Sequence, residues 1–386
     1  MNGKRKLDDS QDDVDHARKK AAIQPNATDC NTDAPETGLG SLLDFSALSS
    51  LEHISARFDA IAHELLCTHV LSVVHNGIHT DYEILELEFY LQKAGCHEDP
   101  FTHGSKEQEH SGQWYFHRMP CRADNNSLGL PVTAAGNYRD GSRKGLDLTL
   151  GAPLSNAPLP RIVTIRGGAL LRTLRRLKDR KLISGPSLLV DEVLRASEAT
   201  SISGLVNDSW NRDIAALTPP AHLRSTYMYL RSRDERNVPA LKTSPTVYRS
   251  PRVGLDLSHP ETKDSLGHPR VAFVDARYRH FTHPELLTTK GRMQTFCGLY
   301  IALRESKGYA HNSVKLKQEL CRLMAYKEQN VLKLLADYKA GYDSGALKSF
   351  LSSAGKGVCQ SSSAYLKMMG TLQKAKEQAY QASTSA

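Results

Sequence analysis

The clearest pattern along the chain is an alternation of apolar and polar residues over 84–91. The apolar members are Leu85, Leu87, Phe89 and Leu91, and the polar members are Glu86, Glu88 and Tyr90. Successive side chains of a β-strand point to opposite faces, so this spacing predicts a strand with its apolar face on a core. The other face presents carboxylates beside a phenol, and the polar loop that follows delivers His103. Such a set at a strand end can form a catalytic pocket, and the alternative is a solvated outer face, which is the usual place of Glu on an amphipathic strand.

Helical and strand-like spacings alternate through the rest of the chain. Apolar residues three and four positions apart predict a helix over 42–74, and Asn76-Gly77 favours the turn into the strand. Further strands are expected over 113–118, 144–150, 161–174 and 270–279, and further helices over 188–196, 293–303, 314–339 and 364–382. Gly167-Gly168 indicates a bulge or a close approach to a ligand, Ser187 is expected to cap a helix, and residues 200–250 are expected to be irregular.

Together these elements predict an α+β fold with a single mixed domain over 41–310, in which helices flank a curved antiparallel β core. Residues 1–40 contain almost no core-forming side chains, which predicts a disordered tail. Residues 311–386 are rich in helix formers and in basic residues. They predict a helical C-terminal extension that binds a partner.

Charge and cysteine usage narrow the classes of function. The 386 residues carry a formal net charge of +8; residues 1–40 hold six Lys/Arg and eight Asp/Glu, a net of −2, which leaves +10 for the remainder. This excess favours a polyanionic partner. Seven cysteines without a Cys-x-x-Cys pair argue against a disulfide framework and a zinc site, and the spacing of His97, His103 and His110 does not suit a metal. No apolar run approaches the length of a membrane span and the N-terminus is polar, so neither membrane contact nor a signal peptide is expected.

Two short basic clusters lie in the N-terminal tail. Lys4-Arg5-Lys6 and Arg18-Lys19-Lys20 are separated by an acidic spacer. Flexible clusters at this distance predict a bipartite nuclear import signal over residues 4–20, with an import receptor as partner and a nuclear location. A solvated run of charges is the alternative.

Five short motifs follow one another along the chain. They are Glu88-Phe89-Tyr90-Leu91, Asp99-Pro100-Phe101-Thr102-His103, Gly112-Gln113-Trp114-Tyr115-Phe116-His117, Gly168-Ala169-Leu170-Leu171-Arg172 and Ser184-Gly185-Pro186-Ser187. In this order they resemble the alkyladenine (3-methyladenine) DNA glycosylase family over about residues 80–280. Pro251-Arg252-Val253-Gly254 is similar to a later segment of that family.

The chain departs from the family at four points. Phe89 replaces an alanine, and His117 stands where the family has a base-stacking tyrosine. A long insert at 119–143 replaces a short link, and the tyrosine that fills the hole left by a flipped base has no clear match.

The resemblance implies an enzyme that flips an alkylated purine out of double-stranded DNA and hydrolyses its C1′–N bond, as in base excision repair. Glu88, His103 and Arg172 are then the expected catalytic residues, with Glu88 activating a water, and Glu86 lies nearer the rim. The base is expected to be held by Tyr90, His117 and Asp147. The basic run after the fourth strand offers phosphate contacts at Arg175, Arg176, Arg180 and Lys181. The chemistry requires no metal and no organic cofactor.

The sequence is also compatible with two other functions. The first is a nucleic-acid-binding module that keeps the fold without the catalysis. The second is an N-glycosidase that acts on RNA or on a free nucleoside. The long insert and the missing tyrosine count against efficient flipping from a duplex and favour both of these alternatives. The set of Glu88, Tyr90, His103 and Arg172 argues against the first.

Overall fold

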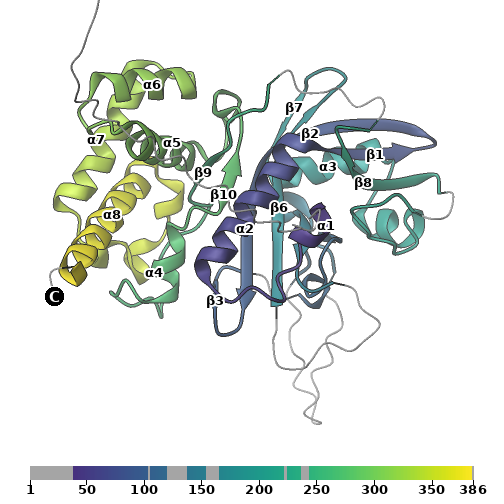
Figure 1. The fold of residues 1–386 in the computed structure, drawn as a ribbon, viewed down its shortest axis with the longest axis horizontal. Coiled ribbons are helices and arrows are strands. Elements are labelled where there is room, and N and C mark those ends of the chain that lie inside the picture. Colours follow the sequence, from purple (N-terminus) through teal and green to yellow (C-terminus); the bar gives the residue numbers. More distant parts are fainter. Residues whose placement is uncertain are drawn as a thin grey trace, which may run out of the picture. The chain divides into compact units, whose positions relative to one another are not determined.

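The computed structural model describes residues 38–102, 105–119, 137–153, 165–220, 224–235 and 243–384. These residues form an α+β fold with an antiparallel sheet and a helical C-terminal part, which confirms the predicted fold class (Figure 1). The predicted import signal over 4–20 and most of the predicted 1–40 tail lie outside the described residues, as do residues 120–136 of the insert.

The helices are α1 (Leu39–Leu42), α2 (Leu51–His63), α3 (Pro186–Ala196), α4 (Pro269–Val274), α5 (Arg292–Lys307), α6 (Val314–Met324), α7 (Glu328–Ser344) and α8 (Ser362–Thr384). The strands are β1 (His69–His75), β2 (Ile78–Lys93), β3 (His97–Glu98), β4 (Trp114–Phe116), β5 (Leu146–Leu150), β6 (Ile165–Arg176), β7 (Leu182–Ser184), β8 (Thr226–Ser232), β9 (Tyr248–Ser250) and β10 (Arg279–Phe281). Two π-helical turns, Glu64–Thr68 and Gly204–Ser209, complete the larger elements among the described residues.

The long strand β2 is the centre of the sheet. The strands follow the order β4-β5-β6-β2-β1-β8, and every pairing is antiparallel. One edge of β2 pairs with β6, and its other edge pairs first with β1 and then with β10. Asn76 and Gly77 join β1 to β2 with φ values of 49° and 78°, as the predicted two-residue hairpin turn requires.

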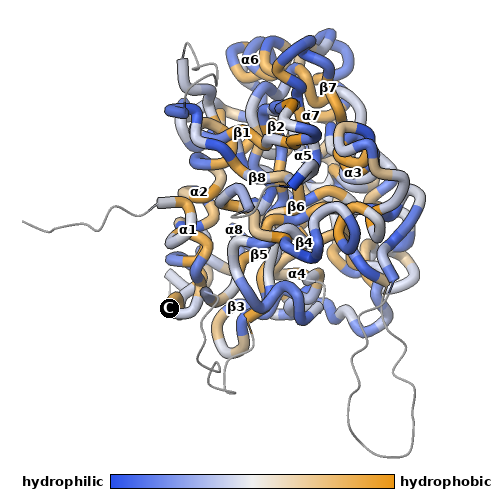
Figure 2. The backbone as a smooth tube through the Cα atoms, turned by 90° about the vertical axis from the view of Figure 1, so that its right-hand side faces the viewer, coloured by the Kyte–Doolittle hydropathy of each residue, from blue (hydrophilic) through white to orange (hydrophobic). Residues whose placement is uncertain are grey.

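Two apolar cores support the sheet and the helices. In the first, α2 packs on the sheet, and the ring of Phe58 stacks on that of Phe89 with centroids 4.6 Å apart. The second core contains side chains of α5, α7 and α8, among them Phe296, Leu335 and Tyr365. Leu257 and residues of α4 also belong to it. Figure 2 shows apolar and polar stretches alternating along α6, as expected for a helix with one buried face.

Two sequence predictions of element type are wrong. The expected helix over 42–74 ends at a π-helical turn, and residues 69–75 form β1, where valines favour an extended backbone. The expected strand over 270–279 begins as helix α4, because Pro269 occupies its first turn and the His268 ring accepts the Arg270 N–H. The strand β10 starts only at Arg279.

Smaller differences concern element ends. Residues 314–339 form two helices, since the backbone at Ala325 turns into the left-handed region with φ of 52°. Residues 200–250 include β8 and β9 in addition to irregular chain. Ser187 does not cap α3, because Gly185 holds that position and the Ser187 hydroxyl donates to the Gly141 carbonyl at 2.7 Å. Among the described residues, no helix is both long enough and apolar enough to cross a membrane.

Candidate active site

The polar face of β2 is buried against other parts of the protein. Glu86, Glu88 and Tyr90 alternate along it, and their exposed fractions are 2%, 4% and 5%. An irregularity in the pairing with β6 lies between Ile84 and Leu87. Leu85, predicted to join the apolar core, lies at this irregularity and is buried outside both apolar clusters.

Glu88 is held by two donors that come from distant parts of the chain. Its Oε2 accepts from Arg172 Nη1 at 3.1 Å, and its Oε1 accepts from the Val253 backbone N–H at 2.6 Å. An ionised carboxylate offers about four lone-pair sites, so each oxygen keeps the capacity to bind a water or a substrate hydroxyl. The two donors therefore fix the direction of the carboxylate without using all of its acceptor capacity.

Glu86 is buried and does not lie at the rim of the site, contrary to the prediction. Its Oε1 accepts from Arg279 Nε at 2.6 Å and from Arg172 Nε at 3.0 Å, while Thr173 donates to its Oε2 at 2.5 Å. Burial opposes ionisation, but Arg279 and Arg172 outweigh it and lower the pKa of Glu86 to about 2. Two guanidinium groups thus keep Glu86 ionised in spite of its burial.

Arg172 lies between the two carboxylates. It is 6% exposed, and although burial opposes its charge, Glu88 and Glu86 raise its pKa. Arg279 completes the group and also donates to Ser250 Oγ at 2.9 Å and Thr295 Oγ1 at 3.1 Å. We call Glu86, Glu88, Arg172 and Arg279 the ion cluster. Two carboxylates and two guanidinium groups give it a net charge near zero.

Arg279 was not predicted as a site residue from the sequence. The available signal was an arginine that follows a short apolar run, Val271-Ala272-Phe273-Val274, and precedes Phe281. A charged side chain in an otherwise apolar strand needs a buried partner. That signal indicates a pair but does not identify Glu86 as the partner.

A second polar group lies two residues further along β2. The Tyr90 hydroxyl donates to Asp147 Oδ2, and the Gln108 side-chain amide donates to the Tyr90 hydroxyl at 3.1 Å. His117 Nε2 lies 3.0 Å from Asp147 Oδ1. Burial raises the pKa of Asp147 well above its usual range, which favours the neutral carboxylic acid. We call Tyr90, Gln108, His117 and Asp147 the tyrosine cluster.

Gly168 makes room for the tyrosine cluster. A Cβ at this position would lie 2.9 Å from the Tyr90 hydroxyl oxygen and 3.1 Å from the Asp147 Cβ. The close approach anticipated for Gly167-Gly168 is therefore made to protein side chains.

The sequence motifs meet around the ion cluster. Arg252 forms a two-pronged ion pair with Asp99, at 2.6 and 3.1 Å, which ties the loop before His103 to the segment that holds Val253. The Gly185 N–H donates to the Arg172 carbonyl at 2.8 Å. Residues separated by up to 165 positions thus converge on Glu88. His103 itself lies outside the described residues.

The predicted phosphate contacts fall into two kinds. Arg175 is buried, and its Nε lies 2.5 Å from Glu83 Oε2, so this residue is not available to a phosphate. Arg176 is paired with Asp179 at 3.0 Å and with Glu192 at 3.3 Å. Arg180 and Lys181 are exposed at the turn between β6 and β7, and Arg180 Nη1 lies 3.5 Å from Glu83 Oε2. At about 3.3 Å per residue, the end of β6 at Arg176 is roughly 20 Å from the part of that strand that pairs with Glu88.

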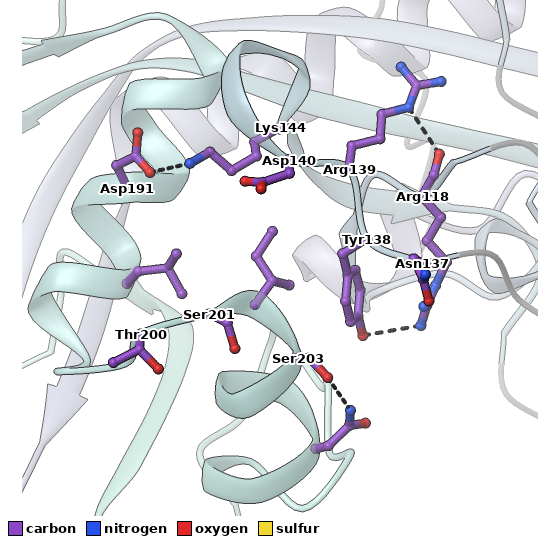
Figure 3. Close-up of a pocket in the computed structure, with 13 residues that line it drawn as sticks. Arg118, Asn137, Tyr138, Arg139, Asp140, Lys144, Asp191, Thr200, Ser201 and Ser203 are labelled. Carbon is purple, nitrogen blue, oxygen red and sulfur yellow. Dashed lines mark hydrogen bonds and ion pairs between the residues drawn. The ribbon is translucent and has the colours of Figure 1, made fainter.

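A polar cavity of about 560 Å³ lies apart from both clusters (Figure 3). Its described lining residues are Arg118, Asn137, Tyr138, Arg139, Asp140, Lys144, Asp191, Leu194, Thr200, Ser201, Ile202, Ser203 and Asn207. Figure 3 shows Lys144 paired with Asp191 and the Arg118 guanidinium beside the Tyr138 hydroxyl, at 3.1 Å. None of the predicted catalytic or base-binding residues is among these lining residues.

Comparisons with known proteins add little about function. No protein-family model matches the chain. Over 195 residues it is 29% identical to the uncharacterised protein L759 of Acanthamoeba polyphaga mimivirus, a stretch that covers 50% of this chain and 76% of the viral protein.

Proposed function

We propose that this protein is a DNA N-glycosylase that flips an alkylated purine out of the duplex and hydrolyses its C1′–N bond. The observation that carries the proposal is the setting of Glu88, a buried carboxylate fixed by Arg172 and by the Val253 N–H where the sequence motifs meet. A pair of donors that orients one carboxylate without consuming its lone pairs suits a group that must position and deprotonate water.

Cleavage of the C1′–N bond passes through a transition state with positive charge on the sugar, as in glycoside hydrolysis. In the proposed reaction Glu88 accepts a proton from the attacking water and stabilises that positive charge. Arg172 fixes the orientation of Glu88, since its guanidinium lies 3.1 Å from the carboxylate. Glu86 and Arg279 act through Arg172 by fixing its position.

The tyrosine cluster is the proposed contact for the base. Tyr90 lies on the same strand face as Glu88, about 6.6 Å along the strand, which is comparable to the distance between a sugar and its base. The cluster contains a phenol, an imidazole, an amide and a carboxyl group that bond to one another, and in the proposed complex the edge of a purine would exchange for some of these bonds. His103 belongs to this proposal through the family resemblance.

The proposed partner is damaged double-stranded DNA. Arg180 and Lys181 remain candidates for phosphate contacts because both are exposed, and the net charge of +8 supports a polyanionic ligand. A nuclear location, through an import receptor that binds residues 4–20, belongs to the same proposal.

The test compares base release from alkylated duplex DNA by the wild type and by Glu88→Gln. This variant keeps the size of the side chain and removes its charge, and we expect release to fall by about 10²–10⁴-fold, the range typical of general base catalysis. Glu83→Gln is the matched control, because Glu83 is also a buried, ion-paired carboxylate of β2 but pairs with Arg175 away from the ion cluster. It should retain release.

Other outcomes would point to the other functions. If neither the wild type nor Glu88→Gln releases a base while both bind DNA in a salt-sensitive way, the protein is a binding module. Release from alkylated RNA or from a nucleoside, but not from duplex DNA, would identify an N-glycosidase of a different substrate.

A further inference from the structure

A cavity of about 620 Å³ lies beside the ion cluster, lined by Val253, by the chain that leads into α5 and by residues of the C-terminal helical part. Its lining residues are Val253, Thr289, Lys290, Gly291, Arg292, Met293, Gln294, Tyr326, Asn330, Lys333, Leu334, Cys359, Gln360 and Ser362. Val253 connects the cavity to the site, because its backbone N–H holds Glu88. Gly291 is a second connection, since a Cβ there would lie 3.2 Å from Arg279 Nη2.

The lining of this cavity is cationic. It contains Lys290, Arg292 and Lys333 and no carboxylate. Within the described part of the chain, none of these three cations lies within 4.0 Å of an acidic group, whereas most arginines near the ion cluster are paired. Arg292 lies over the ring of Tyr326, 4.4 Å from its centroid, which limits its movement.

The N-terminus of helix α5 opens into the same cavity. This 16-residue helix begins at Arg292 after Gly291, with no side-chain cap and no acidic residue in its first turn. Free N–H groups at such an end attract anions. Gln294, in the first turn, is fully buried and lines the cavity. Tyr365 lies beside its amide, yet neither group has a hydrogen-bond partner of normal geometry among the described residues.

We propose that this cavity binds a phosphate group of the substrate, held next to the nucleotide on which Glu88 acts. The identity of the ligand rests on the proposed glycosidase function, whereas the anion site rests on the three cations, the helix end and the buried amide of Gln294. The phosphate belongs either to a polynucleotide backbone or to a free nucleotide. In both cases the C-terminal helices supply part of the substrate site, through Asn330 and Lys333 of α7 and Ser362 of α8.

The test uses the full chain in which Lys290, Arg292 and Lys333 are all replaced by Gln. All three side chains are exposed, so the variant is expected to fold, and a thermal melt checks this. The control replaces Lys307, Lys315 and Lys348 by Gln, which removes the same net charge from exposed positions outside the cavity. Both triple variants are made in the Glu88→Gln background, so that binding is measured without turnover.

Binding of a labelled alkylated duplex is measured by fluorescence anisotropy from low to high salt. We expect the cavity variant to bind about tenfold more weakly than the control, with a salt slope smaller by roughly 0.9 for each phosphate that the variant no longer neutralises. Calorimetry with inorganic phosphate and with a nucleoside monophosphate forms the second arm.

Weaker binding in the duplex arm assigns the phosphate to the backbone, and weaker binding in the nucleotide arm alone assigns it to a free nucleotide. Equal binding by the two variants in every arm overturns the proposed site. Base release by the wild type is scored separately. If the wild type releases no base but the cavity variant binds more weakly than the control, the phosphate site is supported and the glycosylase function is refuted.

Discussion

The ion cluster and the tyrosine cluster both lie on the polar face of β2, but they shift the pKa of a buried carboxyl group in opposite directions. In the ion cluster each carboxylate has a guanidinium partner, and the pKa of Glu86 falls to about 2. In the tyrosine cluster Asp147 faces a phenol, an amide and an imidazole, and burial raises its pKa well above the usual range. Of these two neighbouring clusters, the ion cluster therefore favours an ionised carboxylate at Glu86, and the tyrosine cluster favours a neutral carboxylic acid at Asp147.

This difference shows that burial alone does not decide ionisation. Glu86 and Asp147 are both almost inaccessible to solvent, with exposed fractions of 2% and 0%. Burial destabilises the charged form of each, and only the presence of nearby cations reverses its effect.

The largest effect is expected from removing a cation from the ion cluster. Arg279→Met should lower the free energy of unfolding by about 3–5 kcal/mol, because Glu86 would lose a partner while remaining buried. Urea denaturation measures this loss. Arg322→Met is the control, since it breaks an exposed pair with Glu319 that is worth only about 0.2–1 kcal/mol. Equal losses in the two variants would mean that the ion cluster adds nothing beyond a surface pair.

A smaller effect is expected from crowding the tyrosine cluster. Gly168→Ala places a methyl group 2.9 Å from the Tyr90 hydroxyl oxygen, so Tyr90 must shift and its bond to Asp147 is disturbed. We expect a loss of about 1–3 kcal/mol, as for other overpacked sites, measured by urea denaturation. In the control Gly267→Ala the nearest atom is Ser265 Oγ at 3.8 Å, and stability should change little.

The two clusters should also respond to pH with opposite signs. The pKa of Glu86 is lowered on folding, so its contribution to stability is complete above its ordinary pKa of about 4.3 and is lost as the pH falls toward 2. The difference in unfolding free energy between the wild type and Glu86→Gln should therefore shrink when the pH is lowered from 7 to 3.

The pKa of Asp147 is raised on folding, so its contribution is complete below its ordinary pKa of about 3.9 and declines as the pH rises. The unfolding free energy of the wild type, relative to that of Asp147→Asn, should therefore be higher near pH 4 than near pH 7. Urea denaturation at both pH values measures each difference. A parallel pH trend for Glu86→Gln and Asp147→Asn would contradict the assignment of opposite charge states.

Much of the fold follows from local sequence patterns. The alternation over 84–91, the turn at Asn76-Gly77 and the strands that became β4, β5 and β6 were predicted, because side-chain alternation is a property of the extended backbone itself. The run at 271–274 was predicted incorrectly, because four apolar residues do not separate strand from helix, and Pro269 and the second core decided the outcome.

The sequence by itself determined that Glu86, Glu88 and Tyr90 share one face of a strand, since that result depends only on neighbouring residues. Only the tertiary structure decided which groups meet that face. Arg172 lies 84 positions from Glu88, and Arg279 lies 193 positions from Glu86. The physical reason is that ionisation and orientation depend on charges within a few ångströms, and sheet pairing, which no local pattern specifies, brings those charges together.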